Sequence, residues 1–237
     1  MLVAGFPAGS FAANCYVVAP APGEECVIVD PGQGAGDGIE ELLTRYRLKP
    51  IAVLLTHGHI DHIWSVGPVC GARGIPAYIH PGDRELLADP AKGFPAGQAE
   101  ELFGGRITFT EPDDVRELAD GGRVPLAGLT FTVGHAPGHT QGSVTFWNPG
   151  TAAGPGQPAP GDPALLFSGD LLFAGSIGRT DLPGGDHQAM MSSLARTLTL
   201  PDATVVLPGH GPHTTIGAER AGNPFLAGIS RPAPRGL

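Results

Sequence analysis

A short cluster of metal-ligating side chains lies between residues 56 and 62. The segment reads Thr-His-Gly-His-Ile-Asp-His and supplies three imidazoles and one carboxylate, from His57, His59, Asp61 and His62. Imidazole nitrogens together with carboxylate oxygens suit zinc, iron or manganese better than calcium or magnesium. The cluster therefore predicts a site for one of these three metals.

The spacing within this cluster predicts two metal positions. His57 and His59 are two residues apart in an extended loop, so both side chains can point to one side and share a cation. Asp61 and His62 follow where the chain turns into a helix, and we expect them to face a neighbouring cation. Because four side chains cannot complete two tetrahedral sites, further ligands must come from elsewhere.

Three later loops, each with a glycine beside a metal-ligating residue, offer these ligands: His139, Asp170 and His210. Each loop alone is a weak signal, because an isolated histidine is more often a structural, hydrogen-bonded residue. Taken with the cluster at 56–62, they predict a site of five histidines and two aspartates, in which glycine lets the backbone approach closely. Asp170 is the expected bridge, since a carboxylate can bind two cations and an imidazole cannot. The remaining histidines are expected at the surface or in supporting positions: His80, His135, His187 and His213.

Strands and helices alternate along the chain and place these residues at strand ends. Apolar patterning predicts a strand or pair of strands before residue 20, and then strands at 25–30, 51–55, 77–80, 129–133, 143–147, 164–167 and 204–207. It predicts helices at 37–47, 62–72, 190–200 and 216–221. Residues 89–105 are expected to form a surface excursion, and residues 149–163 a flexible Gly/Pro loop. This order predicts an α/β (α+β) domain of two sheets packed face to face, with helices outside.

Composition narrows the function classes. The chain has 237 residues, of which 41% are hydrophobic and 16% charged, as in a globular protein. A net charge of -9 repels phosphate backbones and anionic headgroups, so neither nucleic acid nor a membrane is an expected partner. With no apolar run near ~18 residues we expect a soluble, cytoplasmic protein. The three cysteines have no zinc-like spacing and are expected to be buried free thiols. Oligomeric state stays open.

Asp30, at another predicted strand end before Pro31-Gly32, has two interpretations. Its carboxylate could orient a ligand imidazole, or it could merely cap the turn. The turn residues that follow slightly favour the cap.

These motifs resemble those of the metallo-β-lactamase superfamily, and within it the hydroxyacylglutathione hydrolase (glyoxalase II) branch and its shorter bacterial relatives. The resemblance covers nearly the whole chain and rests on residues 56–62, 138–140, 168–170, 175–181 and 207–211. It implies a single αββα sandwich domain over residues 1–237, with the metal site at one edge. It also implies that two divalent cations are bound: the first by His57, His59 and His139, the second by Asp61, His62 and His210, with Asp170 bridging them.

The resemblance implies a hydrolase that uses a metal-bridging hydroxide, with zinc expected and iron or manganese as alternatives. Such metals lower the pKa of a bound water from about 15.7 toward about 7, and Asp61 could orient the hydroxide while acting as a ligand. A thiolate, with a parent pKa near about 8.5, leaves without a strong acid, whereas an amide nitrogen needs protonation. We therefore expect a small-molecule thioester, of the hydroxyacyl-thiol class, rather than a β-lactam.

Two features of the C-terminal half bear on the substrate. Full-length glyoxalase II enzymes carry a C-terminal helical domain with basic residues for glutathione, whereas this chain ends at residue 237, soon after His210. The acyl-thiol chemistry is thus expected without that glutathione clamp. Arg179, in the Gly-rich stretch, could anchor a substrate carboxylate or the metal-site loops, or could only form a salt bridge with Asp181 or Asp186.

Two alternatives to the hydrolase stay open. The related persulfide dioxygenases also resemble this chain, and they use one iron held by two histidines and a carboxylate, here His57, His139 and Asp170. Full retention of the other ligands does not decide between the two enzymes. A non-catalytic metal-binding domain is the second alternative, and the complete ligand set argues against it.

Overall fold

The protein is an αββα sandwich, described by a computed structural model over residues 1–105, 108–150 and 161–229. The first sheet has the strand order β1 (Leu2–Ala8), β2 (Ala13–Ala19), β3 (Glu25–Val29), β4 (Lys49–Leu54), β5 (Ala77–Ile79) and β6 (Val115–Glu117). The second has the order β14 (Thr214–Thr215), β13 (Val205–Pro208), β10 (Leu165–Gly169), β9 (Val144–Asn148), β8 (Leu129–His135) and β7 (Arg123–Leu126). A small hairpin pairs β11 (Leu172–Phe173) with β12 (Ser176–Ile177). The predicted fold class is confirmed.

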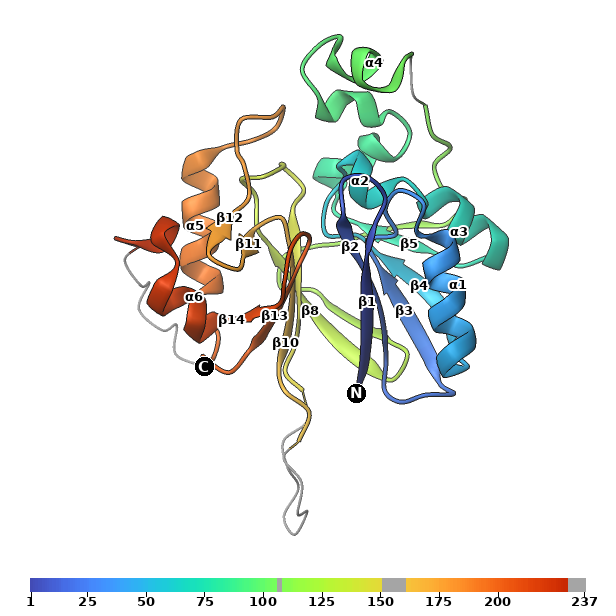
Figure 1. Cartoon of the computed structure of the whole chain (residues 1–237), viewed down its shortest axis with the longest axis horizontal. Coiled ribbons are helices and arrows are strands. Elements are labelled where there is room, and N and C mark those ends of the chain that lie inside the picture. Colours follow the sequence, from blue (N-terminus) through green and yellow to red (C-terminus); the bar gives the residue numbers. More distant parts are fainter. Residues whose placement is uncertain (106–107, 151–160, 230–237) are drawn as a thin grey trace.

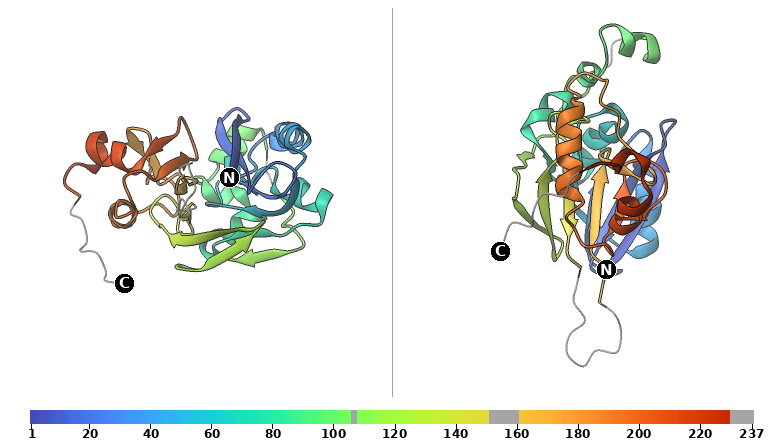
Figure 2. Two further views of the ribbon diagram at one scale, coloured as in Figure 1. Left: turned by 90° about the horizontal axis from the view of Figure 1, so that it is seen from below. Right: turned by 90° about the vertical axis from the view of Figure 1, so that its left-hand side faces the viewer.

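Helices cover the outer face of each sheet. The helices α1 (Ala35–Tyr46) and α3 (Val66–Arg73) pack against the first sheet, and α5 (His187–Thr197) and α6 (Ile216–Gly222) against the second (Figure 1). Seen from below, in the left panel of Figure 2, the two helical layers lie on opposite outer sides of the sheet pair. Three apolar layers result, one between the sheets and one under each helical layer.

The continuous apolar runs in the central strands follow from this layering. In β3, Val27 and Val29 point into the core between the sheets, whereas Cys26 and Ile28 point toward the helices. Successive side chains of a strand face opposite sides, so a strand covered on both faces must be apolar at every position. A shift of such a strand along its own axis would carry the polar residues at its ends into the core, and this fixes where those ends emerge.

The strand directions bring the polar ends together at one edge. Strand β4 is parallel to β3 and β5, and β10 is parallel to β13, so the loops that follow them leave on the same side of their sheets. The two sheets are linked at that edge. Ala13 forms an isolated β-bridge with His210, and the backbone N–H of Asn14 donates to the Gly209 carbonyl at 2.7 Å. Loops from both sheets therefore face one another there.

Two predicted segments differ from the structure in detail. The predicted helix at 62–72 is two helices, α2 (Ile60–Ile63) and α3, separated at Ser65, whose hydroxyl donates to the Gly32 carbonyl at 2.6 Å. The predicted excursion at 89–105 contains a 3-10 turn, η2 (Pro90–Gly93), and α4 (Gln98–Phe103), which stands at the top of Figure 1. Within the predicted loop at 149–163, residues 151–160 lie outside the described residues.

The three cysteines are free and buried, as predicted. Burial raises the pKa of the Cys26 and Cys70 thiols to about 12, so both are inert thiols at neutral pH. Over the described part of the chain, no helix has the length and apolar character that a membrane crossing requires.

Candidate metal centre

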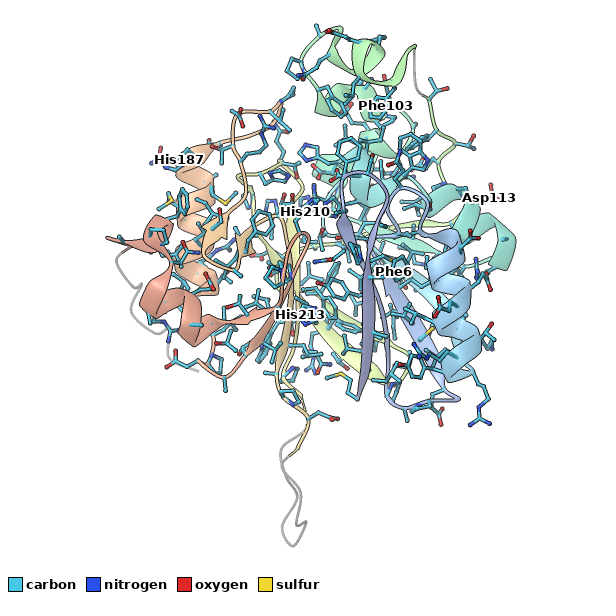
Figure 3. The ribbon with its side chains drawn as sticks, in the orientation of Figure 1. Phe6, Phe103, Asp113, His187, His210 and His213 are labelled. Atoms are coloured by element: carbon cyan, nitrogen blue, oxygen red, sulfur yellow. The ribbon has the colours of Figure 1, made fainter. Side chains whose placement is uncertain are left out.

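All seven predicted ligands lie at the edge where the two sheets meet. His57 and His59 follow β4, and Asp61 and His62 belong to α2. The second sheet supplies the other three from the loops or ends after β8, β10 and β13: His139, Asp170 and His210. In Figure 3, His210 lies between the two halves, near their upper ends.

The ligand atoms form three overlapping groups, and within each group they lie within 4.8 Å of one another. These groups are His57, His59 and His139; His57, His62 and Asp170; and Asp61, His62 and His210. Asp170 stands between the first and last groups, because its Oδ2 is 3.5 Å from His139 Nε2 and 3.6 Å from His210 Nε2. This is where a bridging carboxylate would have to lie.

The hydrogen bonds of the imidazoles show which nitrogens carry lone pairs. His139 Nδ1 donates to the Arg179 carbonyl at 2.8 Å, so its Nε2 is unprotonated in the neutral ring. That Nε2 lies only 2.8 Å from His59 Nδ1. Without a metal, the neutral His59 ring can donate a hydrogen bond to this atom, and a shared cation would replace the proton between the two nitrogens.

Buried ligand atoms without hydrogen-bond partners give a second test of whether a cation fits. His57 Nδ1 faces the Thr56 hydroxyl at 3.1 Å, and that hydroxyl already donates to Asp30, so Nδ1 carries the ring proton. His57 Nε2 is then a buried acceptor without a partner, as is Asp170 Oδ1. Leaving such an atom unpaired costs about 1–3 kcal/mol. Both atoms point into the groups described above, so the donor set fits a metal ion.

Asp30 orients two of the candidate ligands from behind. Its carboxylate is buried and accepts hydrogen bonds from His62 Nδ1 at 3.0 Å, from the Thr56 amide at 2.8 Å and from the Thr56 hydroxyl at 2.6 Å. It therefore fixes His62 directly and His57 through Thr56. The favoured interpretation as a mere turn cap was wrong. The backbone of Asp30 has a φ of 48°, a conformation that a non-glycine residue holds only when its surroundings enforce it.

Asp83, which the sequence did not single out, ties together ligand loops from both sheets. It lies in a 3-10 turn, η1 (Pro81–Leu87), and its buried carboxylate accepts from the Gly58 amide at 2.8 Å. The same carboxylate accepts from the Thr140 hydroxyl at 2.6 Å and from the Gly142 amide at 2.7 Å. An aspartate after Pro-Gly is an ordinary turn residue in sequence, so no local signal distinguished it.

Charge divides the centre into two parts. Burial, followed by the neighbouring imidazoles, lowers the pKa of His57, and burial and His139 lower that of His59 to about 3. At His62, burial also lowers the pKa, but the carboxylates of Asp61 and Asp170 outweigh it and raise the pKa to about 10. Without metal, His57 and His59 are therefore neutral at pH 7, and His62 holds a proton between the carboxylates of Asp61 and Asp170.

The loop after β13 is packed so closely that it requires glycine. A Cβ atom on Gly209 would lie 2.1 Å from Asp170 Oδ1 and 2.8 Å from His62 Cε1. The Gly209 amide donates to the Gly169 carbonyl at 2.9 Å, which holds the ends of β10 and β13 together. Glycine beside a ligand thus lets the backbone touch the centre, as the sequence predicts.

The remaining predicted residues lie outside the three ligand groups. Arg179 forms a two-bond ion pair with Asp181, at 2.7 Å each, and its side chain is 59% exposed. The salt bridge is thus present, and a role in anchoring substrate stays a prediction. The other four histidines belong to none of the three groups: His80, His135, His187 and His213.

Two solved structures resemble the whole chain. One is a crystal structure described as the BLEG-1 B3 metallo-beta-lactamase, which is 40% identical, has a TM-score of 0.81 and covers 96% of this chain and 100% of its own. The other is TTHA1623 in a di-iron-bound form, which is 40% identical, has a TM-score of 0.76 and covers 94% of this chain and 100% of its own. The second structure shows that a similar fold holds two iron ions.

Sequence relatives cover nearly the same span. The probable metallo-hydrolase YqgX of Bacillus subtilis is 36% identical over 225 residues, which is 94% of this chain and 97% of that protein. The hydroxyacylglutathione hydrolase GloC of Haemophilus influenzae is 32% identical over 222 residues, which is 93% of this chain and 95% of that protein. The family profile described as "Metallo-beta-lactamase superfamily" matches residues 8–151 and 144–210. The chain therefore belongs to the metallo-β-lactamase superfamily, the family that its histidine and aspartate motifs resemble.

Proposed function

We propose that the protein hydrolyses thioesters of the hydroxyacyl-thiol class. The observation that carries this proposal is the pair of adjacent ligand groups, one of three histidines and one of two histidines and Asp61, with Asp170 between them. Similarity to a hydroxyacylglutathione hydrolase supports the substrate class. The broader assignment of the chain to a superfamily that includes metallo-hydrolases rests on the match to the family profile and on the similarity to YqgX.

We propose that His57, His59 and His139 hold one divalent cation, that Asp61, His62 and His210 hold a second, and that Asp170 binds both. Zinc is the expected metal, and the di-iron form of a 40% identical structure makes iron the first alternative. When bound, such cations supply hydroxide at neutral pH and polarise a carbonyl group.

The protein's own groups support this chemistry. The pKa of Asp61 lies below its usual range, since His62 and His210 outweigh the effect of burial, and it stays a carboxylate that can accept a hydrogen bond from the attacking water. No side chain has to protonate the leaving group, because a thiolate is stable near neutral pH. Asp30 and Asp83 would hold the ligands in place while water attacks.

Thiol release measures this activity. We expect protein treated with a chelator to be inactive toward S-lactoylglutathione and to regain activity with zinc, manganese or iron. Failure of every metal to restore release of the thiol would contradict the proposal. Oxygen uptake with glutathione persulfide would instead assign the iron dioxygenase, and metal binding with neither reaction would assign a non-catalytic domain.

β-Lactam hydrolysis is a second candidate, favoured by the 40% identity to a B3 metallo-beta-lactamase. An amide nitrogen leaves only after protonation, and Asp61 is ionised and thus a poor acid. We therefore expect a chromogenic cephalosporin to be cleaved with a lower kcat/KM than a thioester. A higher kcat/KM for the cephalosporin than for the thioester would make β-lactam hydrolysis the proposed function instead.

The cellular setting is also a proposal. Three buried free thiols are compatible with a reducing compartment, and we propose a cytoplasmic enzyme that acts on a small molecule.

A further inference from the structure

We propose that a row of aromatic side chains beside the metal centre binds an apolar group of the substrate, attached next to the scissile carbonyl. This inference rests on the proposed thioester hydrolysis and specifies its substrate. The aromatic row consists of Phe11, Trp64, Phe94 and Phe103. They come from four segments: the loop between β1 and β2, the end of α2, the end of η2, and α4.

Phe103 stands at the centre of the row. Its ring centroid is 6.4 Å from that of Phe11, 5.9 Å from that of Phe94 and 5.8 Å from that of Trp64. Figure 3 shows Phe103 at the top of the molecule, above the edge that holds His210. These tilted and edge contacts are the geometries that aromatic rings prefer, and they make one connected apolar surface.

The segments that carry the row run next to both parts of the metal centre. Phe11 comes two residues before Ala13, which forms the isolated bridge with His210. Phe94 directly follows Gly93, where an added Cβ would lie 3.1 Å from His59 Cδ2. Trp64 is the second residue after His62. A molecule whose carbonyl lies at the metal centre would therefore have the row beside it.

The row is partly open to solvent: Phe11 is exposed, and the other three rings are half-buried. Phe11 is 36% exposed, and Leu102, next to Phe103, is 55% exposed, and these are two of the three large hydrophobic side chains exposed among the described residues. On the other side of the centre, the Phe173 ring lies 6.1 Å from the His210 ring. Exposed apolar side chains gathered beside a polar centre are typical of a binding site that orients a partly apolar ligand.

The cations near the centre favour the same substrate class. Lys92, beside Gly93, pairs with Glu85 at 2.6 Å, and Arg179 pairs with Asp181. A negatively charged substrate group would have to compete with these carboxylates. An apolar substrate group meets no such competition. Removing its surface and the exposed parts of the rings from water is favourable without any ion pair being broken.

Two series of thioesters test the inference. In one, acyl chains of two to eight carbons are joined to N-acetylcysteamine, and in the other, acetyl is joined to thiols of two to eight carbons. Since each buried methylene contributes about fourfold, we expect kcat/KM to rise at least about tenfold along one series, which identifies the side that contacts the row. Values that stay level along both series overturn the inference.

Variants locate the effect. In Phe103→Ala, we expect the ratio of kcat/KM for the longest and shortest substrates to fall toward one. Phe225→Ala is the matched control, because Phe225 is 52% exposed in a separate turn, η3 (Pro224–Leu226), and the ratio should persist there. An unchanged ratio in Phe103→Ala, or an equal loss in both variants, overturns the role of the row.

Binding without turnover separates this inference from the proposed function. The S-octyl and S-ethyl thioethers of N-acetylcysteamine cannot be hydrolysed, and calorimetry measures their binding to metal-loaded protein. If the octyl compound binds more tightly than the ethyl compound, and Phe103→Ala removes the difference, the row binds apolar groups even if no thioester is cleaved. If the two thioethers bind equally well, the row does not bind an apolar group, even if thioesters are cleaved.

Discussion

Two buried carboxylates, which are not themselves candidate metal ligands, hold the candidate ligands in position. Asp30 holds His62 through a 3.0 Å hydrogen bond, and Asp83 holds the Gly58 amide and the Thr140 hydroxyl at 2.8 and 2.6 Å. Each is almost fully buried and accepts three hydrogen bonds, two of Asp30 from Thr56 and one of Asp83 from the Gly142 amide, in addition to those just given. Such supporting groups typically change metal affinity or activity by about 10- to 100-fold when they are altered.

Replacing Asp83 should weaken metal binding at the three-histidine group. The side-chain amide of an asparagine would turn an N–H toward a backbone amide or hydroxyl that now donates, so Asp83→Asn should lower the affinity about 10- to 100-fold, measured by metal titration. Glu85→Gln is the control, because Glu85 lies in the same 3-10 turn, is exposed and pairs only with Lys92 in the described contacts. Equal affinity in the two variants would exclude a positioning role for Asp83.

The raised pKa of His62 predicts that metal binding there depends on pH. Its usual pKa is 6.5, and in the metal-free centre, where Asp61 and Asp170 outweigh burial, it is about 10, so a cation must displace a proton. Affinity at this group should rise with pH by at least about tenfold per unit up to about pH 10, because Asp61 and Asp170 outweigh burial at His210 as well and raise its pKa. His57 and His59, whose pKa values burial lowers, are already neutral and should bind a cation without releasing a proton.

Calorimetry in buffers of different ionisation enthalpy counts these protons. We expect the step that fills the group of Asp61, His62 and His210 to release at least about one proton near neutral pH, and more protons than the other step. Two steps with the same proton release would contradict the charge difference between the groups.

At the scale of elements, strand ends do most of the positioning. Strands β4, β10 and β13 are buried on both faces, and each delivers a candidate ligand within a few residues of its last paired position. The ends of β10 and β13 are held together by the Gly209 amide, which leaves no space for a side chain between them. The strand ends therefore supply well-ordered supports for the candidate ligands that follow them.

A methyl group in the loop after β13 should disturb the centre selectively. The Cβ of Gly209→Ala would press on Asp170 and His62, and we expect metal affinity to fall more than about tenfold. Gly23→Ala, in the loop between β2 and β3, is the control: apart from its chain neighbours nothing lies within 4 Å of the added Cβ, and its φ of 87° costs stability by about 1–2 kcal/mol away from every candidate ligand. Metal titration and thermal unfolding of both variants separate the two effects. If both variants bind metal equally well, the close approach at Gly209 does not matter.

At the scale of the whole molecule, the centre joins the two halves of the sandwich. The first sheet and α2 provide His57, His59, Asp61 and His62, while the second sheet provides His139, Asp170 and His210. A cation in either group would bind side chains from both halves. Since the unfolded chain does not preform these groups, metal binding should add directly to folding stability.

Removing metal should lower the unfolding temperature. At a free metal concentration of 100 times Kd, binding adds about 2.7 kcal/mol, and each kcal/mol shifts Tm by about 2–4 °C in a chain of this size. We expect a chelator to lower Tm by about 5–10 °C and added zinc to restore it. A Tm that does not respond to the chelator would mean that the metal does not link the halves.

The extent of sequence-based prediction differed between elements. The central strands were predicted within a few residues. An unbroken apolar run such as Val27 to Val29 is stable only where both faces of the strand are buried. Short edge strands such as β6 and β14 were not predicted, since three and two residues carry too little pattern to distinguish them from loops. The break between α2 and α3 was also missed, because it depends on a hydrogen bond from Ser65 to Gly32, which is distant in sequence.

The candidate ligands and their order could be predicted from the chain itself, because their spacing and the glycines beside them are local features. The tertiary structure alone decided how these side chains are held and charged. His59 faces His139, Asp83 joins Gly58 to Thr140, and His62 gains a proton from contacts between segments far apart in sequence. Hydrogen-bond partners, burial and pKa depend on which atoms meet in space, and no spacing along a single chain specifies that.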